Sequence, residues 1–127
     1  MVYHGTSDPI FSSDDTRARY QALGTANNAD ASDFARYFPV PGMHHCSGGP
    51  ATDQFDMLTP LVNWVEKGQA PDSVIASARG VGNAAGVNAD LPANWSATRT
   101  RPLCPFPKVA RYKGSGSIED AASFSCQ

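Results

Sequence analysis

The sequence predicts an α/β fold in which short strands alternate with helices. Two stretches rich in aromatic and β-branched residues, Val2–His4 and Phe34–Val40, are typical of strands, and each is followed by turn-forming residues. Apolar residues recur at helical spacing from Asp53 to Lys67, and Gly68 then provides a helix stop. Strands and helices that alternate in this way usually form a sheet with helices packed on it.

The helix between the two strands is indicated by its flanking residues. Ser12 and Ser13 are good N-cap residues, and Asp14 and Asp15 lie where a helix dipole favours negative charge. We therefore expect a helix from Asp14 to Leu23, with Gly24 as its C-cap. In the later helix, Pro60 predicts either a kink or a short non-helical entry before it.

The rest of the chain contains shorter elements. Ser73–Ala78 and Val109–Tyr112 are strand candidates, Glu119–Ser123 is expected to form one helical turn, and Gly80–Trp95 shows no clear element. We interpret residues 1–127 as part of one domain. The strands and their loops extend to about residue 79, and residues 80–127 form a loop-rich tail.

Composition excludes several classes of protein. The chain has 127 residues, of which 41% are hydrophobic and 17% charged, with a formal net charge of −2. These values are ordinary for a globular domain and give no attraction to nucleic acid or to anionic lipid. No stretch approaches the roughly 18 apolar residues that a membrane span requires. We expect neither a nucleic acid nor a membrane as partner.

Two loops carry the residues with the clearest chemical potential. The run His4–Pro9 offers Asp8, and the run Pro41–Pro50 offers His45, 37 positions later. This is the order in which an α/β-hydrolase supplies the last two members of a Ser…Asp…His triad. Gly114–Ser117 has the wrong glycine spacing for the G-x-S-x-G nucleophile elbow, so we expect the serine to lie outside this chain.

Simpler interpretations of these residues stay open at this point. An aspartate before proline, such as Asp8, often bonds only to its own turn. The pattern alone does not say whether His44 or His45 is the base. Phe11, three residues after Asp8, is close enough to line a substrate pocket, although simple packing is the default for a phenylalanine.

The chain contains three cysteines. Cys104 and Cys126 are 22 residues apart and are expected to bond to each other. Cys46 is either a small buried apolar residue or the partner of a cysteine outside this chain, and a Cys–His nucleophile is a weaker interpretation. Their spacing matches no zinc motif, and we expect neither a metal nor a cofactor.

Long runs of the sequence resemble the tannase and feruloyl esterase family, which includes mono(2-hydroxyethyl) terephthalate hydrolases. The matching runs extend over most of the chain, and they are Tyr3–Pro9, Val40–Pro50, Phe55–Leu58, Leu61–Gly68, Thr100–Pro105 and Val109–Gly116. The resemblance implies the C-terminal portion of an α/β-hydrolase fold, without the nucleophile elbow and the lid. It also implies that these residues are the last core strands of a mostly parallel sheet.

The resemblance also assigns roles to residues. It implies that Asp8 and His45 are the acid and base of the triad. It further implies that Cys46 bonds to a cysteine just before the missing serine, and that Cys104 and Cys126 form a second family disulfide. Position 44 is usually glycine in this motif and is His44 here, which could crowd the loop.

The function implied is hydrolysis of a small aromatic ester, of the feruloyl, galloyl or terephthalate type, by a serine carboxylesterase. We expect the chain to be inactive alone, because its partner would be the missing N-terminal half of the enzyme. The alternatives are one half of a split esterase and a non-catalytic binding module derived from the fold. The family and the cysteines indicate a secreted or periplasmic location, although this chain shows no signal peptide.

Overall fold

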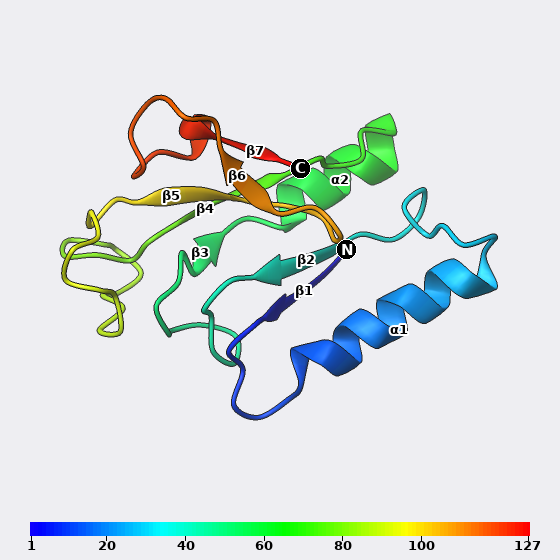
Figure 1. Cartoon of the computed structure of the whole chain (residues 1–127), viewed down its shortest axis with the longest axis horizontal. Helices are drawn as coiled ribbons and strands as arrows, with labels where there is room; N and C mark the ends of the chain where they lie inside the picture. Colours follow the sequence, from blue (N-terminus) through cyan, green and yellow to red (C-terminus); the bar gives the residue numbers. More distant parts are fainter.

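The computed structural model describes all 127 residues (Figure 1). A pair of parallel strands positions the two loops that follow them. Strand β1 (Val2–Gly5) pairs with β2 (Tyr37–Val40), with Val2 opposite Tyr37 and Gly5 opposite Val40. Helix α1 (Ser13–Ala26) provides the crossover that parallel strands require. Because both strands run in one direction, the loops that follow them meet at one edge of the sheet.

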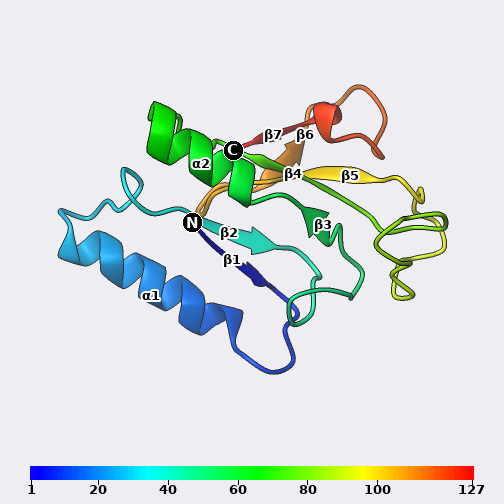
Figure 2. The same ribbon diagram turned by 180° about the vertical axis from the view of Figure 1, so that it is seen from behind.

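The remaining strands are antiparallel, which corrects the expectation of a mostly parallel sheet. One sheet has the order β3-β4-β5, and β6 pairs with β7 in a separate ribbon. The bounds of these strands and of the other helical elements are β3 (Gln54–Phe55), α2 (Leu58–Lys67), β4 (Val74–Ser77), β5 (Thr100–Leu103), β6 (Ala110–Tyr112), η1 (Ala121–Ser123) and β7 (Phe124–Cys126). Figures 1 and 2 show α1 beside β1. They show α2 away from β1, beyond β2 and near β4.

Strand β2 is buried on both faces, as strands of parallel sheets usually are. On one face, Phe38 and Val40 belong to the core cluster, whose other members come from the following loop and the antiparallel sheet: Met43, Ala51, Val74, Ala76 and Leu103. On the other face, Tyr37 lies within about 6 Å, between ring centroids, of both Tyr20 of α1 and Phe106. The strand that precedes the His45 loop is therefore fixed by packing from both sides.

Helix α1 begins where it was predicted but ends later. Ser12 occupies the N-cap position, yet its hydroxyl makes no capping hydrogen bond. The helix continues through Gly24 to Ala26, so the prediction that Gly24 ends it is wrong. Gly24 is buried, and a Cβ at this position would make an ordinary van der Waals contact, 3.4 Å from the carbonyl oxygen of Ala29.

Helix α2 is shorter than predicted, because Gln54–Phe55 form β3 instead of a first helical turn. The carboxylate of Asp56 accepts hydrogen bonds from the N–H groups of Leu58 and Thr59, which satisfies two donors at the helix start. Pro60 then falls in the first turn, where its missing N–H costs no helical hydrogen bond. The expected non-helical entry before Pro60 is confirmed, as is the helix end at Gly68, which has φ = 68°.

The apolar stripe of α2 is only partly covered by the rest of the chain. No residue of the helix is buried, and Leu58 and Val65 are 69% and 77% exposed. Strand β1 has only one neighbour, so its outer edge is unpaired. Neither helix has the length and apolarity that a membrane crossing requires.

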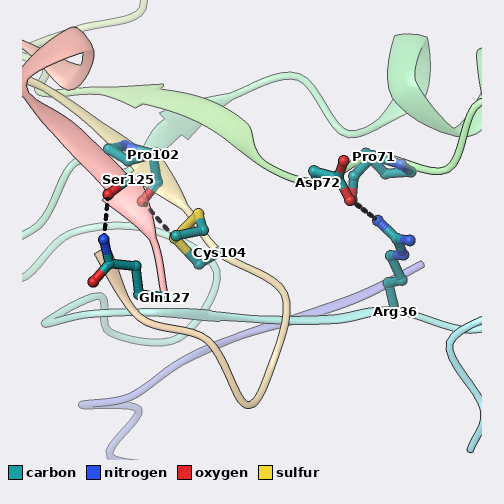
Figure 3. The surroundings of a disulfide bond; sticks show 8 residues. Arg36, Pro71, Asp72, Pro102, Cys104, Ser125 and Gln127 are labelled. Atoms are coloured by element: carbon teal, nitrogen blue, oxygen red, sulfur yellow. Dashed lines mark hydrogen bonds and ion pairs between the residues drawn. A yellow bond between two sulfur atoms is a disulfide. The ribbon is translucent and has the colours of Figure 1, made fainter. Parts of the chain in front are cut away.

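A disulfide and an ion pair fix the tail to β5. Cys104, directly after β5, is joined to Cys126 of β7, with a Cα–Cα distance of 5.5 Å (Figure 3). Arg99, just before β5, donates from Nε to Glu119 at 2.7 Å, and the same carboxylate accepts the N–H of Ser96 at 2.9 Å.

A separate contact fixes the start of β2. Arg36, just before this strand, donates to Asp72 at 3.0 Å and to the carbonyl oxygen of Pro71 (Figure 3).

We expect the contribution of Glu119 to stability to disappear in acid. The hydrogen bond from Arg99 outweighs partial burial and lowers the pKa of Glu119 from 4.5 to about 2. A carboxyl with a depressed pKa stabilises the folded state above its unfolded pKa, and this stabilisation is lost as the pH falls through the folded value. The melting-temperature difference between wild type and Glu119→Gln should therefore be largest above pH 5 and should shrink toward pH 2.

The other glutamate of the chain provides the control. Glu66 is exposed on α2 and forms no ion pair, so Glu66→Gln should change the melting temperature little at any pH. A Glu119→Gln difference that stays constant from pH 5 to pH 2.5 would contradict this assignment.

The exposed apolar surfaces predict that the 127-residue polypeptide alone associates with itself. Unpaired strand edges and uncovered apolar faces are common sites of association. Light scattering should show particles larger than a monomer, and Leu58→Lys with Val65→Lys should reduce their size. A monodisperse sample that melts cooperatively would count against this expectation.

Candidate active site

The Asp8 loop is joined to the His45 loop by the backbone. The N–H groups of Thr6 and Ser7 donate to the carbonyl oxygens of Val40 and Met43, each at 3.0 Å. The N–H of Gly42 returns a bond to the hydroxyl oxygen of Thr6, also at 3.0 Å. The parallel pairing of β1 and β2 thus continues past the ends of both strands.

Gly5 permits this close approach. A Cβ at position 5 would collide with the carbonyl oxygens of Met43 and His44. Any side chain there would push the His45 loop away from the end of β1. We infer that the glycine is required for the spacing between the two loops.

Asp8 is buried and held by its own turn. Its side chain is 3% exposed, and Oδ1 accepts the N–H groups of Ile10 at 2.8 Å and Phe11 at 3.1 Å. The simple interpretation of a turn aspartate is therefore correct for one of its two oxygens. The other oxygen, Oδ2, is free to bond elsewhere.

His45 is the histidine that meets this second oxygen. Its Nδ1 lies 2.8 Å from Asp8 Oδ2, and its side chain is 41% exposed. An ionised carboxylate only accepts hydrogen bonds, so His45 donates through Nδ1 and its Nε2 is left to act as an acceptor. That nitrogen makes no hydrogen bond within the chain.

His44 faces a different direction. Its ring packs against Gly49, where a Cβ would lie 2.9 Å from the ring carbon Cδ2. Its Nδ1 is 3.9 Å from a carboxylate oxygen of Asp90. The bulk of His44 is thus accommodated over a glycine, and of the two adjacent histidines it is His45 that bonds to Asp8.

Burial and hydrogen bonding oppose each other at Asp8. Burial alone would raise the pKa of its carboxyl group. The hydrogen bonds from His45, from the N–H groups of Ile10 and Phe11 and from His4 outweigh burial and hold the pKa of Asp8 well below its ordinary value. Asp8 is therefore ionised wherever an imidazole can act as a base.

A second histidine, His4, also contacts Asp8, and no sequence pattern singled it out. The ring nitrogen Nε2 of His4 lies 3.0 Å from Asp8 Oδ2, and its Nδ1 lies 2.7 Å from the hydroxyl oxygen of Thr16 on α1. The signal in the sequence was a histidine at the end of the strand, four residues before the aspartate. That pattern alone does not distinguish His4 from an ordinary strand residue.

Residues from distant parts of the sequence, which no local pattern indicated, support the His45 loop. The carboxylate of Asp53 accepts the N–H of Gly48 at 2.7 Å and receives both Nε and Nη2 of Arg79, at 3.1 and 2.6 Å. Asn88 donates to the carbonyl oxygen of Gly49 at 2.9 Å, and Asp90 accepts the N–H of Gly49 at 2.8 Å. The segment without clear elements therefore supports the loop that carries His45.

A hollow of about 390 Å³ opens beside the Asp8–His45 pair. Phe11 lines it, with its ring centroid 5.4 Å from that of His45, and Cys46 lies at the same place. Cys46 is exposed, makes no disulfide within the chain and has φ = 64°, an uncommon value for a residue with a side chain. No group of three His, Cys, Asp or Glu side chains is placed to hold a metal ion.

Solved structures with the same arrangement of elements are esterases. The chain superposes on an esterase from Aspergillus oryzae with a TM-score of 0.76 and 29% identity, covering 98% of this chain and 26% of that one. It also superposes on feruloyl esterase B from the same organism, with a TM-score of 0.70. The architecture is thus an α/β-hydrolase-like fold of the esterase type.

Residues 1–127 match the family described as "Tannase and feruloyl esterase", and the chain belongs to that family. It is 55% identical over 126 residues to a mono(2-hydroxyethyl) terephthalate hydrolase from Piscinibacter sakaiensis, covering 99% of this chain and 19% of that protein. It is 33% identical to feruloyl esterase B from Aspergillus niger, covering 99% of this chain and 25% of that protein. The chain therefore spans a quarter or less of the length of these relatives.

The supports of the His45 loop generate a prediction. Arg79→Met leaves the fully buried carboxylate of Asp53 without its cation, and breaking a buried pair in this way costs about 3 kcal/mol. The free energy of unfolding, measured with denaturant, should fall by that amount. The free energy of unfolding of Arg79→Lys should lie between those of wild type and Arg79→Met, because lysine keeps the charge but cannot donate the same bidentate hydrogen bond.

Arg111 gives the matched control for this measurement. It is exposed on β6 and forms no ion pair, so Arg111→Met should leave stability almost unchanged. If Arg79→Met were as stable as Arg111→Met, the Asp53–Arg79 pair would not support the loop.

Proposed function

We propose that this chain supplies the acid–base residues of a serine carboxylesterase. The observation that carries the proposal is the bond from His45 Nδ1 to buried Asp8 at 2.8 Å, with His45 Nε2 left unbonded. In a triad, the carboxylate fixes the tautomer of the imidazole and stabilises the imidazolium that forms during the reaction. The arrangement of Asp8 and His45 is suited to both tasks.

In the proposed reaction, His45 Nε2 takes the proton of a serine hydroxyl as the serine oxygen attacks the ester carbonyl. The low pKa of Asp8 keeps it ionised, so it stabilises the positive charge on His45. His45 then gives the proton to the departing alcohol, and the acyl group stays on the serine. Water repeats the cycle and releases the acid.

The serine belongs to a part of the enzyme outside these residues. We propose that the chain is the C-terminal portion of a longer esterase and has no activity alone. Cys46, exposed beside His45, would bond to a cysteine next to that serine and tie the base loop to the nucleophile. Such a tie lowers the entropic cost of holding two reacting groups together.

The proposed substrate class is an ester of a small aromatic acid. The names of the relatives support it, because they are a terephthalate monoester hydrolase and feruloyl esterases. Phe11 provides an aromatic surface beside His45 on which such a ring can pack. The disulfide between Cys104 and Cys126 supports a secreted or periplasmic location.

Substitution of His45 tests the mechanism. In the full-length protein, His45→Ala should lower kcat for a chromogenic aryl ester by at least ~10³-fold, as loss of a triad member does. His44→Ala is the matched control, because His44 has a similar position in the chain but faces Gly49 and Asp90. It should keep kcat within about threefold of wild type. Near-normal turnover in His45→Ala would remove this residue from the mechanism.

A further inference from the structure

Asp8 has more hydrogen-bond partners than a triad carboxylate needs. Oδ1 accepts two backbone N–H groups, and Oδ2 lies within hydrogen-bond distance of both His45 and His4. A carboxylate has about four lone-pair sites, so four donors fill its capacity. The mechanism above explains only the bond to His45.

The partners of Oδ2 differ in how firmly they are held. His45 lies on a loop and is 41% exposed, whereas the side chain of His4 is 15% exposed and belongs to β1. The second nitrogen of His4 is also bonded, to Thr16 on α1 at 2.7 Å. His4 is thus fixed by a strand and a helix, and it is the more rigid of the two.

The bonding pattern also determines which ring nitrogen of His4 donates to Asp8. Asp8 only accepts, so His4 donates to it through Nε2–H. In neutral His4 the nitrogen Nδ1 then accepts the hydroxyl proton of Thr16. The chain Thr16, His4, Asp8, His45 is therefore a continuous series of hydrogen bonds from helix α1 to the hollow.

We propose that His4 is a positioning residue that aims Asp8 at His45, and that Thr16 fixes His4 for this purpose. The backbone donors hold Oδ1, and His4 holds Oδ2, so the plane of the carboxylate is set before His45 binds to it. The exposed imidazole is then oriented by a carboxylate that cannot rotate. This inference rests on the function proposed above, since it assigns a role within the same site.

Two amide substitutions separate hydrogen bonding from packing. Glutamine places its amide nitrogen about where Nε2 of histidine lies, and asparagine places it about where Nδ1 lies. In the full-length protein, His4→Gln should therefore keep the bond to Asp8, and His4→Asn should lose it. We expect His4→Asn to lower kcat for an aryl ester roughly 10- to 100-fold with KM almost unchanged, as misplacement of a catalytic group does.

The same measurement with His4→Gln should give a kcat within about threefold of wild type. Equal losses in both variants would overturn the proposal, because His4 would then matter only for packing. Near-normal turnover in both would overturn it as well. Thr16→Val and Thr16→Ser extend the test: valine removes the hydroxyl group and should lower kcat, and serine keeps it and should not. This pair decides the matter if His4→Asn does not fold.

Asp8→Asn and His45→Ala are measured in parallel. If both abolish turnover while His4→Asn does not, only the role of His4 is wrong. If both retain turnover, the proposed function fails, and the role of His4 fails with it.

Discussion

The parallel pairing of β1 and β2 is the constraint from which the site follows. It places the loops after both strands at one sheet edge, and the bonds of Thr6 and Ser7 to Val40 and Met43 extend that pairing beyond the strands. Burial of β2 on both faces fixes the strand that carries the His45 loop. Side-chain atoms of two residues far apart in the sequence, Asp8 Oδ2 and His45 Nδ1, thereby come within 2.8 Å of each other.

Hydrogen bonds from surrounding residues hold both Asp8 and the loop that carries His45. Asp8 is held by its own turn and by His4, and the His45 loop is held by Asp53, Asn88 and Asp90. His4, Asp53 and Asn88 are buried or half-buried, Asp90 is exposed, and the imidazole of His45 is open to the hollow. This division suits an acid–base group, which needs a fixed orientation and access to substrate at the same time.

The sequence was informative where the signals are local. The strands at Val2–His4 and Ser73–Ala78, the helix end at Gly68 and the turn at Glu119–Ser123 all depend on neighbouring residues, and the structure contains an element at each place. The end of α1 and the antiparallel sheet depend on tertiary packing, so a local pattern did not predict them. For the site, the order and spacing of Asp8 and His45 in the sequence indicated both residues as candidates. The contributions of His4, Arg79 and Asn88 exist only through contacts with distant residues, which no spacing rule reveals.

The unequal exposure of the pair has a consequence for reagents that attack the site. An electrophile that enters the hollow meets the open imidazole nitrogen of His45, whereas the carboxylate of Asp8 lies beneath its four donors and is screened from attack. In the full-length enzyme, where the proposed disulfide removes the thiol of Cys46, covalent labelling of the hollow should be selective for one nitrogen of one ring. Carbodiimide-type activation of the acid should be slow as long as the fold is intact.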